Sequence, residues 1–175
     1  NVIVEAGPSA CTTSYKAMET IDRYAWHMAN LEGVEQVITL PMAAKMVNAG
    51  WNDGSPRWKV LPRDPDTLRQ STQSFETDSG LLNADCSAIP VTIFTSDHKS
   101  TTIDRLVAAT KQFRTENNAY EPGFARKRDA AMAKAQETGE EYTTDQVNFR
   151  LATGPLGVQA ATNDTVREKE HLILY

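Results

Sequence analysis

Two segments of the chain repeat one order of secondary structure, and this repetition limits the fold more than any other feature. Residues 1–40 and residues 89–152 each predict a strand, a helix and a second strand. In the second segment Val147, Phe149 and Leu151 alternate with polar residues, as one face of a half-buried strand does. The chain therefore contains two successive βαβ patterns.

Two βαβ halves predict an α+β fold of the ferredoxin-like, split βαβ type. In that topology the first and third strands are central, adjacent and antiparallel. We expect one domain over residues 1–175. Its parts are a first βαβ unit (1–40), a helical or irregular insertion between strands two and three (41–87), a second βαβ unit (88–153) with a polar insertion before strand four (116–144), and a C-terminal helix (154–175).

Composition excludes several functional classes. The 175 residues are 40% apolar and 23% charged, which is a globular balance. The net charge of −5 excludes a generally basic surface for nucleic acid. The sequence contains no GxSxG elbow, no phosphate-binding P-loop and no HExxH pair. We therefore expect no enzymatic activity, no cofactor and no metal site.

The chain has two cysteines, Cys11 and Cys86. Two buried free thiols are one interpretation. The predicted fold favours a disulfide, because Cys11 follows the first strand and Cys86 precedes the adjacent, antiparallel third strand. That bond would add about 4 kcal/mol on the chain-entropy model. It would also place the domain outside the reducing cytosol.

Trp51 and Trp58 lie in a turn-rich stretch with Gly, Asn, Asp and Pro. One interpretation is that both rings pack beneath the loop. The alternative is a docking surface for another domain or subunit, because aromatic side chains concentrate in interface cores. The pair is therefore the candidate interface site.

Three other stretches have simpler interpretations. GPLGVQAATN (154–163) is a tight strand-to-helix turn, with an anion site as the alternative. Asp97-His98 is a helix cap with an exposed first turn, although acid–base chemistry is the other option. ARKR (125–128) is a solvated helix face, with contact to a partner or a lipid headgroup as the alternative.

Several blocks of the sequence, in register, resemble one known protein family. They are AMETIDRYAWHMANLEGVEQVITLPMAAKMVNAGWNDGSPRWKVLPR (17–63), GLLNADCSAIPVTIFTSDHKSTTIDRLV (80–107) and FRLATGPLGVQAATNDTV (149–166). These blocks resemble the periplasmic loops of RND-superfamily exporters (resistance–nodulation–division permeases) of the MMPL type. The resemblance covers nearly the whole chain except about residues 116–144.

The resemblance implies a soluble periplasmic domain at the face of the bacterial inner membrane. The cysteine-bearing pattern is similar to the second of the family's two large periplasmic loops. Such exporters use the proton gradient to move hydrophobic or amphiphilic substrates, and their proton-relay carboxylates lie in membrane helices, so no catalytic residue carries over. The implied partners are the rest of the transporter chain, a hydrophobic small molecule or lipid, and further copies in a homo-oligomer.

The resemblance also concerns the chain ends. The sequence starts at Asn1 without methionine and stops in the apolar run HLILY (171–175), where such exporters continue into a membrane helix. We therefore expect an apolar run of about 20 residues to follow Tyr175 in the gene. The alternative is a free-standing periplasmic ferredoxin-like domain that binds a ligand or regulates, with a signal peptide upstream and a stop codon downstream.

Overall fold

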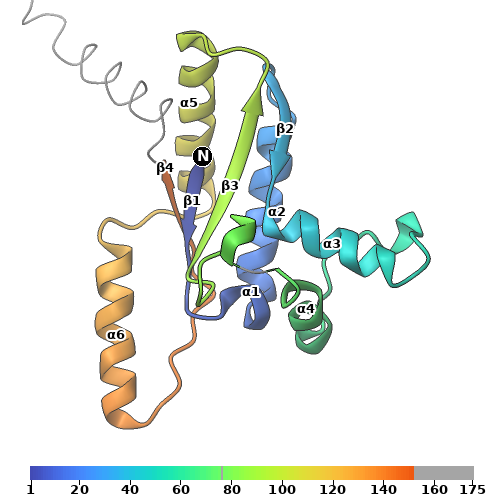
Figure 1. Ribbon diagram of the computed structural model, residues 1–175. Helices are drawn as coiled ribbons and strands as arrows, with labels where there is room; N and C mark the ends of the chain where they lie inside the picture. Colours follow the sequence, from blue (N-terminus) through green and yellow to red (C-terminus); the bar gives the residue numbers. More distant parts are fainter. Residues whose placement is uncertain (76, 152–175) are drawn as a thin grey trace, which may run out of the picture.

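The computed structural model describes residues 1–75 and 77–151, and these residues form a mixed α+β structure (Figure 1). Its strands are β1 (Val2–Glu5), β2 (Val34–Ile38), β3 (Ala88–Thr95) and β4 (Asn148–Leu151). Its α-helices are α1 (Ala10–Thr13), α2 (Tyr15–Ala29), α3 (Leu40–Gly50), α4 (Pro65–Thr72), α5 (Ser100–Glu116) and α6 (Phe124–Thr138). Two short 3₁₀ helices, η1 (Pro56–Trp58) and η2 (Thr77–Ser79), complete the described elements.

The four strands form one antiparallel sheet in the order β2-β3-β1-β4. β1 and β3 occupy its centre. In the register of the sheet Val4 lies opposite Ile89 on one neighbour and Phe149 on the other. All three side chains are fully buried, so they form one apolar layer on one face of the sheet.

Helices α2 and α5 cover that apolar layer, and three aromatic rings join them to the sheet (Figure 1). The Tyr24 ring of α2 lies 5.1 Å from Phe113 of α5 and 4.6 Å from Phe149 of β4, measured between centroids. Phe113 and Phe149 are 5.4 Å apart. Such tilted and edge-to-face contacts are the favoured arrangements of buried aromatic side chains.

The other helices lie around this aromatic cluster, and α1, α3 and α4 add Cys11, Leu40 and Leu68 to the core. α3 projects sideways from the sheet, α1 and α4 pack together below it, and α6 stands beside the end of β1 and β4 (Figure 1). We call α3 and the loop that follows it, residues 40–57, the α3 arm. The α3 arm packs beside α2 and contributes no strand to the sheet.

Some element boundaries differ from the sequence expectation. The second strand ends at Ile38 instead of continuing to Leu40, because the Thr39 hydroxyl accepts from the Met42 N–H (3.3 Å) and begins α3. The short helix α1 was not expected, because four residues are too few to show a helical period. The predicted C-terminal helix, residues 154–175, lies outside the described residues.

Candidate functional site

An open groove lies between the N-terminal half of α2, the α3 helix and residues 58–64, which we call the strap. The volume of this strap groove is about 710 Å³. Pockets for small ligands in proteins measure roughly 300–1,000 Å³. The strap groove is therefore large enough to hold one small molecule.

The strap lies against α3 because the chain reverses direction directly after that helix. Gly54 has a φ of +72°, which glycine adopts without steric cost, and its N–H donates to the Ala49 carbonyl (2.9 Å). The buried Asn48 side chain then donates to the carbonyls of Trp58 (2.9 Å) and Val60 (3.1 Å). Asn48 thus holds the strap in place as one wall of the groove.

The acidic side chains that α2 contributes to the groove already have partners. Asp22 forms an ion pair with Lys45 of α3, with 2.7 Å between Nζ and Oδ1. Glu19 accepts a long hydrogen bond from the Tyr15 hydroxyl (3.4 Å). The Arg63 guanidinium of the strap lies over the Tyr15 ring, 5.8 Å from its centroid. These contacts tie the strap and α3 to α2.

On the remaining walls one charged side chain has hydrogen-bond partners among the described residues and two have none. Asp64 begins α4 by accepting from the N–H (2.9 Å) and hydroxyl (2.7 Å) of Thr67, and this hydroxyl bond lowers the pKa of Asp64. Arg23 and Lys59 also line the groove, and both are exposed. Neither side chain has a hydrogen bond or ion pair with another described residue. The groove therefore presents two unpaired cations.

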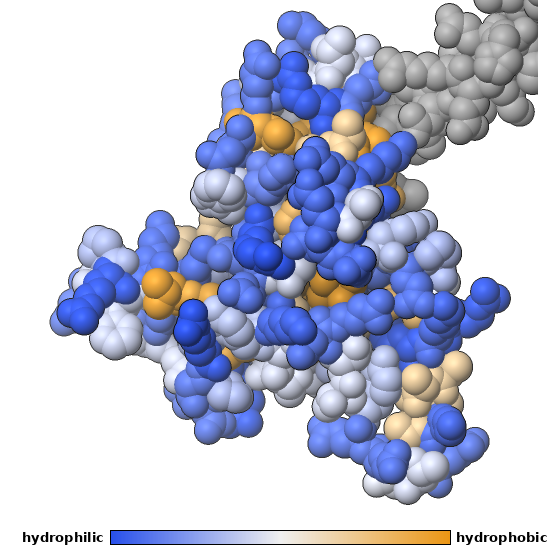
Figure 2. Space-filling model, turned by 180° about the vertical axis from the view of Figure 1, so that it is seen from behind, coloured by the Kyte–Doolittle hydropathy of each residue, from blue (hydrophilic) through white to orange (hydrophobic). Residues whose placement is uncertain are grey.

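The candidate interface residues Trp51 and Trp58 lie near the two ends of the turn between α3 and the strap. Their exposed fractions are 51% and 47%, so neither ring is packed beneath the loop as the first interpretation expected. Trp58 lines the strap groove, whereas Trp51 lies outside the groove lining. Seen from behind, an apolar patch lies on the projecting part of the molecule among hydrophilic residues (Figure 2). Docking at these tryptophans stays a prediction.

The cysteines that the sequence pairs, Cys11 and Cys86, form a disulfide with 5.7 Å between their Cα atoms. Both are buried. The bond joins α1, which follows β1, to the turn that precedes β3. The Thr72 hydroxyl at the end of α4 donates to the Cys11 carbonyl (3.2 Å), so α4 is held at the same place. The disulfide supports the end of the sheet and takes no part in the groove.

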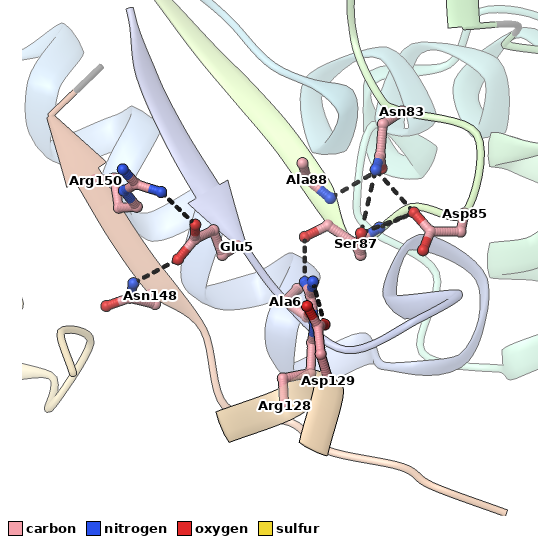
Figure 3. Close-up of polar contacts among 10 residues, drawn as sticks. All are labelled: Glu5, Ala6, Asn83, Asp85, Ser87, Ala88, Arg128, Asp129, Asn148 and Arg150. Atoms are coloured by element: carbon pink, nitrogen blue, oxygen red, sulfur yellow. Dashed lines mark hydrogen bonds and ion pairs between the residues drawn. The ribbon is translucent and has the colours of Figure 1, made fainter. Parts of the chain in front are cut away.

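A buried acid joins the ends of β1 and β4 (Figure 3). The Glu5 carboxylate accepts from the Asn148 amide (2.7 Å) and from the Arg150 guanidinium (2.7 Å). Asn148 lies directly opposite Glu5 in the strand register. Because both carboxylate oxygens are engaged, this cluster is a structural contact. Sequence reasoning missed it, since only the pairing of strands 143 residues apart brings these groups together.

The basic stretch 125–128 is not a fully solvated helix face, and that interpretation is wrong for its last residue. The Arg128 guanidinium donates to the carbonyls of Ala6 (3.1 Å) and Ser87 (3.4 Å), which follow β1 and precede β3 (Figure 3). Its side chain is 13% exposed. Arg128 therefore anchors α6 to the centre of the sheet end.

The described residues contain no group suited to metal binding and no membrane-spanning helix. Within residues 1–75 and 77–151, no three His, Cys, Asp or Glu side chains lie close enough to hold an ion. No helix in that part of the chain has both the length and the apolar character to cross a bilayer.

The Asp97 carboxylate accepts hydrogen bonds at the start of α5, from the Lys99 N–H (3.2 Å) and the Thr102 hydroxyl (2.7 Å). The bond from the Thr102 hydroxyl lowers the pKa of Asp97. The stretch 154–163 lies outside the described residues.

Comparisons with known proteins return no relative: no family model, no curated protein and no solved structure matches the chain. Inference about function therefore depends on the sequence blocks, the strand order and the strap groove.

Proposed function

We propose that the chain is the porter-type periplasmic domain of a proton-driven, RND-superfamily inner-membrane exporter. In this role it contributes to the path or the binding of hydrophobic or amphiphilic substrates, and it performs no chemistry of its own. Its partners are the membrane helices and the other periplasmic loop of the same transporter, with further copies of the chain in a homo-oligomer.

The interleaving of two βαβ units in one sheet carries the proposal. β1, α2 and β2 make the first unit, and β3, α5 and β4 make the second. The order β2-β3-β1-β4 alternates strands from the two units, and every neighbouring pair is antiparallel. This is the strand order of a ferredoxin-like, split βαβ fold, which we assign to the chain. The periplasmic loops that the sequence blocks resemble are built from such units.

The disulfide and the groove support the same role. A buried disulfide between Cys11 and Cys86 fits an oxidising compartment such as the periplasm. One of the stretches that resemble the exporters, NAGWNDGSPRWKVLPR (48–63), forms the end of α3, the turn after it and most of the strap. A substrate path would pass over this wall.

The coding sequence on both sides of the chain tests the proposal directly. We expect an apolar run of about 20 residues to begin within a few codons after Tyr175 and another to precede Asn1. Cysteine accessibility reporters placed in the 175 residues should then locate them on the periplasmic side in intact cells. A stop codon directly after Tyr175, with a signal peptide upstream, would contradict the exporter and support a free-standing periplasmic domain. The groove favours ligand binding as the function of that alternative.

A further inference from the structure

The geometry of the strap groove points to a ligand class: a single amphiphilic molecule with an anionic head group, such as a carboxylate or a phosphate. The head group contacts Arg23 and Lys59, and the apolar part lies along the strap. That the ligand is transported cargo rests on the proposed function. Binding itself can be measured without any membrane helix.

The charge pattern of the groove selects an anion. Four cations line the groove (Arg23, Lys45, Lys59 and Arg63) against three carboxylates (Glu19, Asp22 and Asp64), which leaves an excess of one positive charge. Asp22 is paired with Lys45. Arg23 and Lys59 are left without a partner among the described residues. The whole chain has a net charge of −5, so long-range electrostatic attraction cannot supply this preference for an anion. Local contacts with these two cations would have to supply it.

The strap supplies the apolar part of the site. The side chains of Trp58 and Val60 are about half exposed, at 47% and 51%, and both line the groove. Leu61 and Pro62 continue the same wall. A tryptophan beside aliphatic residues offers a large contact area for an alkyl chain or ring. Apolar contact and unpaired cations on one groove are complementary to the two ends of an amphiphilic anion.

The shape of the groove favours a single molecule over a membrane surface. Two helices and the strap form the walls of this open groove, and its volume of about 710 Å³ lies within the range of small-molecule pockets. A bilayer would require an apolar surface that protrudes, while Arg23 lies on the α2 wall of a hollow. We therefore commit to a monomeric amphiphile as the occupant.

The binding experiment uses Trp58 as its reporter. The chain has three tryptophans, and Trp26 and Trp51 are 70% and 51% exposed, so Trp26→Phe and Trp51→Phe leave Trp58 as the sole tryptophan with little effect on packing. This 175-residue variant is titrated with decanoate, decyl maltoside and decyltrimethylammonium, each below its micelle-forming concentration. We expect a saturable blue shift of Trp58 emission, with decanoate binding tightest and decyltrimethylammonium weakest.

Charge-removal variants locate the head group. Arg23→Gln and Lys59→Gln should each weaken decanoate binding by about two- to fivefold, as expected for exposed charge contacts, and leave decyl maltoside unchanged. Arg57→Gln and Lys16→Gln are the matched controls, because these exposed cations lie near the strap and on α2 but outside the groove lining. The controls should bind decanoate as the parent does.

Four results of the decanoate titrations, and a fifth from lipid vesicles, would overturn the inference. They are equal affinity for the three head groups, no saturable response, equal losses in the control variants, and a Trp58 shift that depends on protein concentration alone, which would indicate a second copy in the groove. Tighter binding to phosphatidylglycerol vesicles than to monomeric decanoate would also overturn it in favour of a membrane surface. None of these results bears on the flanking coding sequence, so failure of the groove and failure of the exporter proposal are distinguishable.

Discussion

Tyr24 places a hydroxyl group at the centre of an apolar core. Its oxygen lies 2.8 Å from the Thr110 hydroxyl oxygen, and its ring contacts Phe113 and Phe149. Burial raises the pKa of Tyr24 to about 12, because the phenolate would lose its hydration inside the core. The folded chain therefore strongly favours the neutral phenol.

This shift predicts a loss of stability at high pH. Unfolded Tyr24 ionises near pH 10.0, whereas the folded chain keeps the proton until about pH 12. The contribution is therefore complete below pH 10 and is lost as the pH rises from 10 toward 12, at up to about 1 kcal/mol per pH unit. Urea unfolding at pH 8, 9, 10 and 11 measures the effect.

The control is Tyr24→Phe, which keeps the ring and removes the titrating group. We expect this variant to be less stable by about 1 kcal/mol at pH 8, because one buried hydrogen bond is lost. Its stability should decline less steeply above pH 10 than that of the parent chain. Parallel declines would show that Tyr24 does not carry the pH dependence.

At the scale of elements, α6 is attached to the molecule by few contacts. Within the described helix Phe124 is the only buried residue, and Arg128 supplies the hydrogen bonds to the sheet end. A helix with so little buried apolar surface opens locally more easily than the core does. Its position therefore depends strongly on Arg128.

Replacing Arg128 with alanine should release α6 and leave the sheet intact. We expect the α6 amides to exchange hydrogen at least about tenfold faster, since the loss of even one charge-assisted hydrogen bond costs about 1.5–3 kcal/mol. The amides of β1 and β3 should exchange as before. Arg126→Ala is the control, because Arg126 is exposed on the same helix. Equal exchange in the two variants would mean that Arg128 does not anchor α6.

The sequence predicted where helices begin when a capping residue marks the start, but it did not predict how the elements pack against one another. The sequence Asp64-Pro65-Asp66 predicts a helix start, and α4 begins at Pro65 with Asp64 as its cap. The strap offers no such signal. Its position comes from the Asn48 amide and the strap carbonyls, whose partners depend on how the chain folds back after α3.

At the scale of the whole molecule, the Cys11–Cys86 disulfide closes a long loop. The two residues are 75 positions apart, and the loop contains α2, β2, α3 and α4. Restricting so long a loop lowers the entropy of the unfolded chain substantially. The bond is therefore expected to affect the stability of all these elements together.

The double variant Cys11→Ala, Cys86→Ala should lose about 4 kcal/mol in free energy of unfolding. Reduction of the parent chain with dithiothreitol should produce a loss of similar size. Chemical denaturation measures both, and dithiothreitol should leave the double variant unaffected. An unchanged midpoint in the double variant would show that the loop contributes no constraint.

The sequence by itself determined the α+β class, the four strand segments and the main helices, because periodicity, caps and turn residues act between neighbours in the chain. It also singled out the cysteine pair. Only the tertiary structure decided that Arg128 reaches the end of the sheet, that Glu5 is paired across strands, and that the strap leaves Arg23 and Lys59 facing one groove. These contacts join residues far apart in sequence, and their partners follow from strand register and chain reversal, which no local pattern encodes.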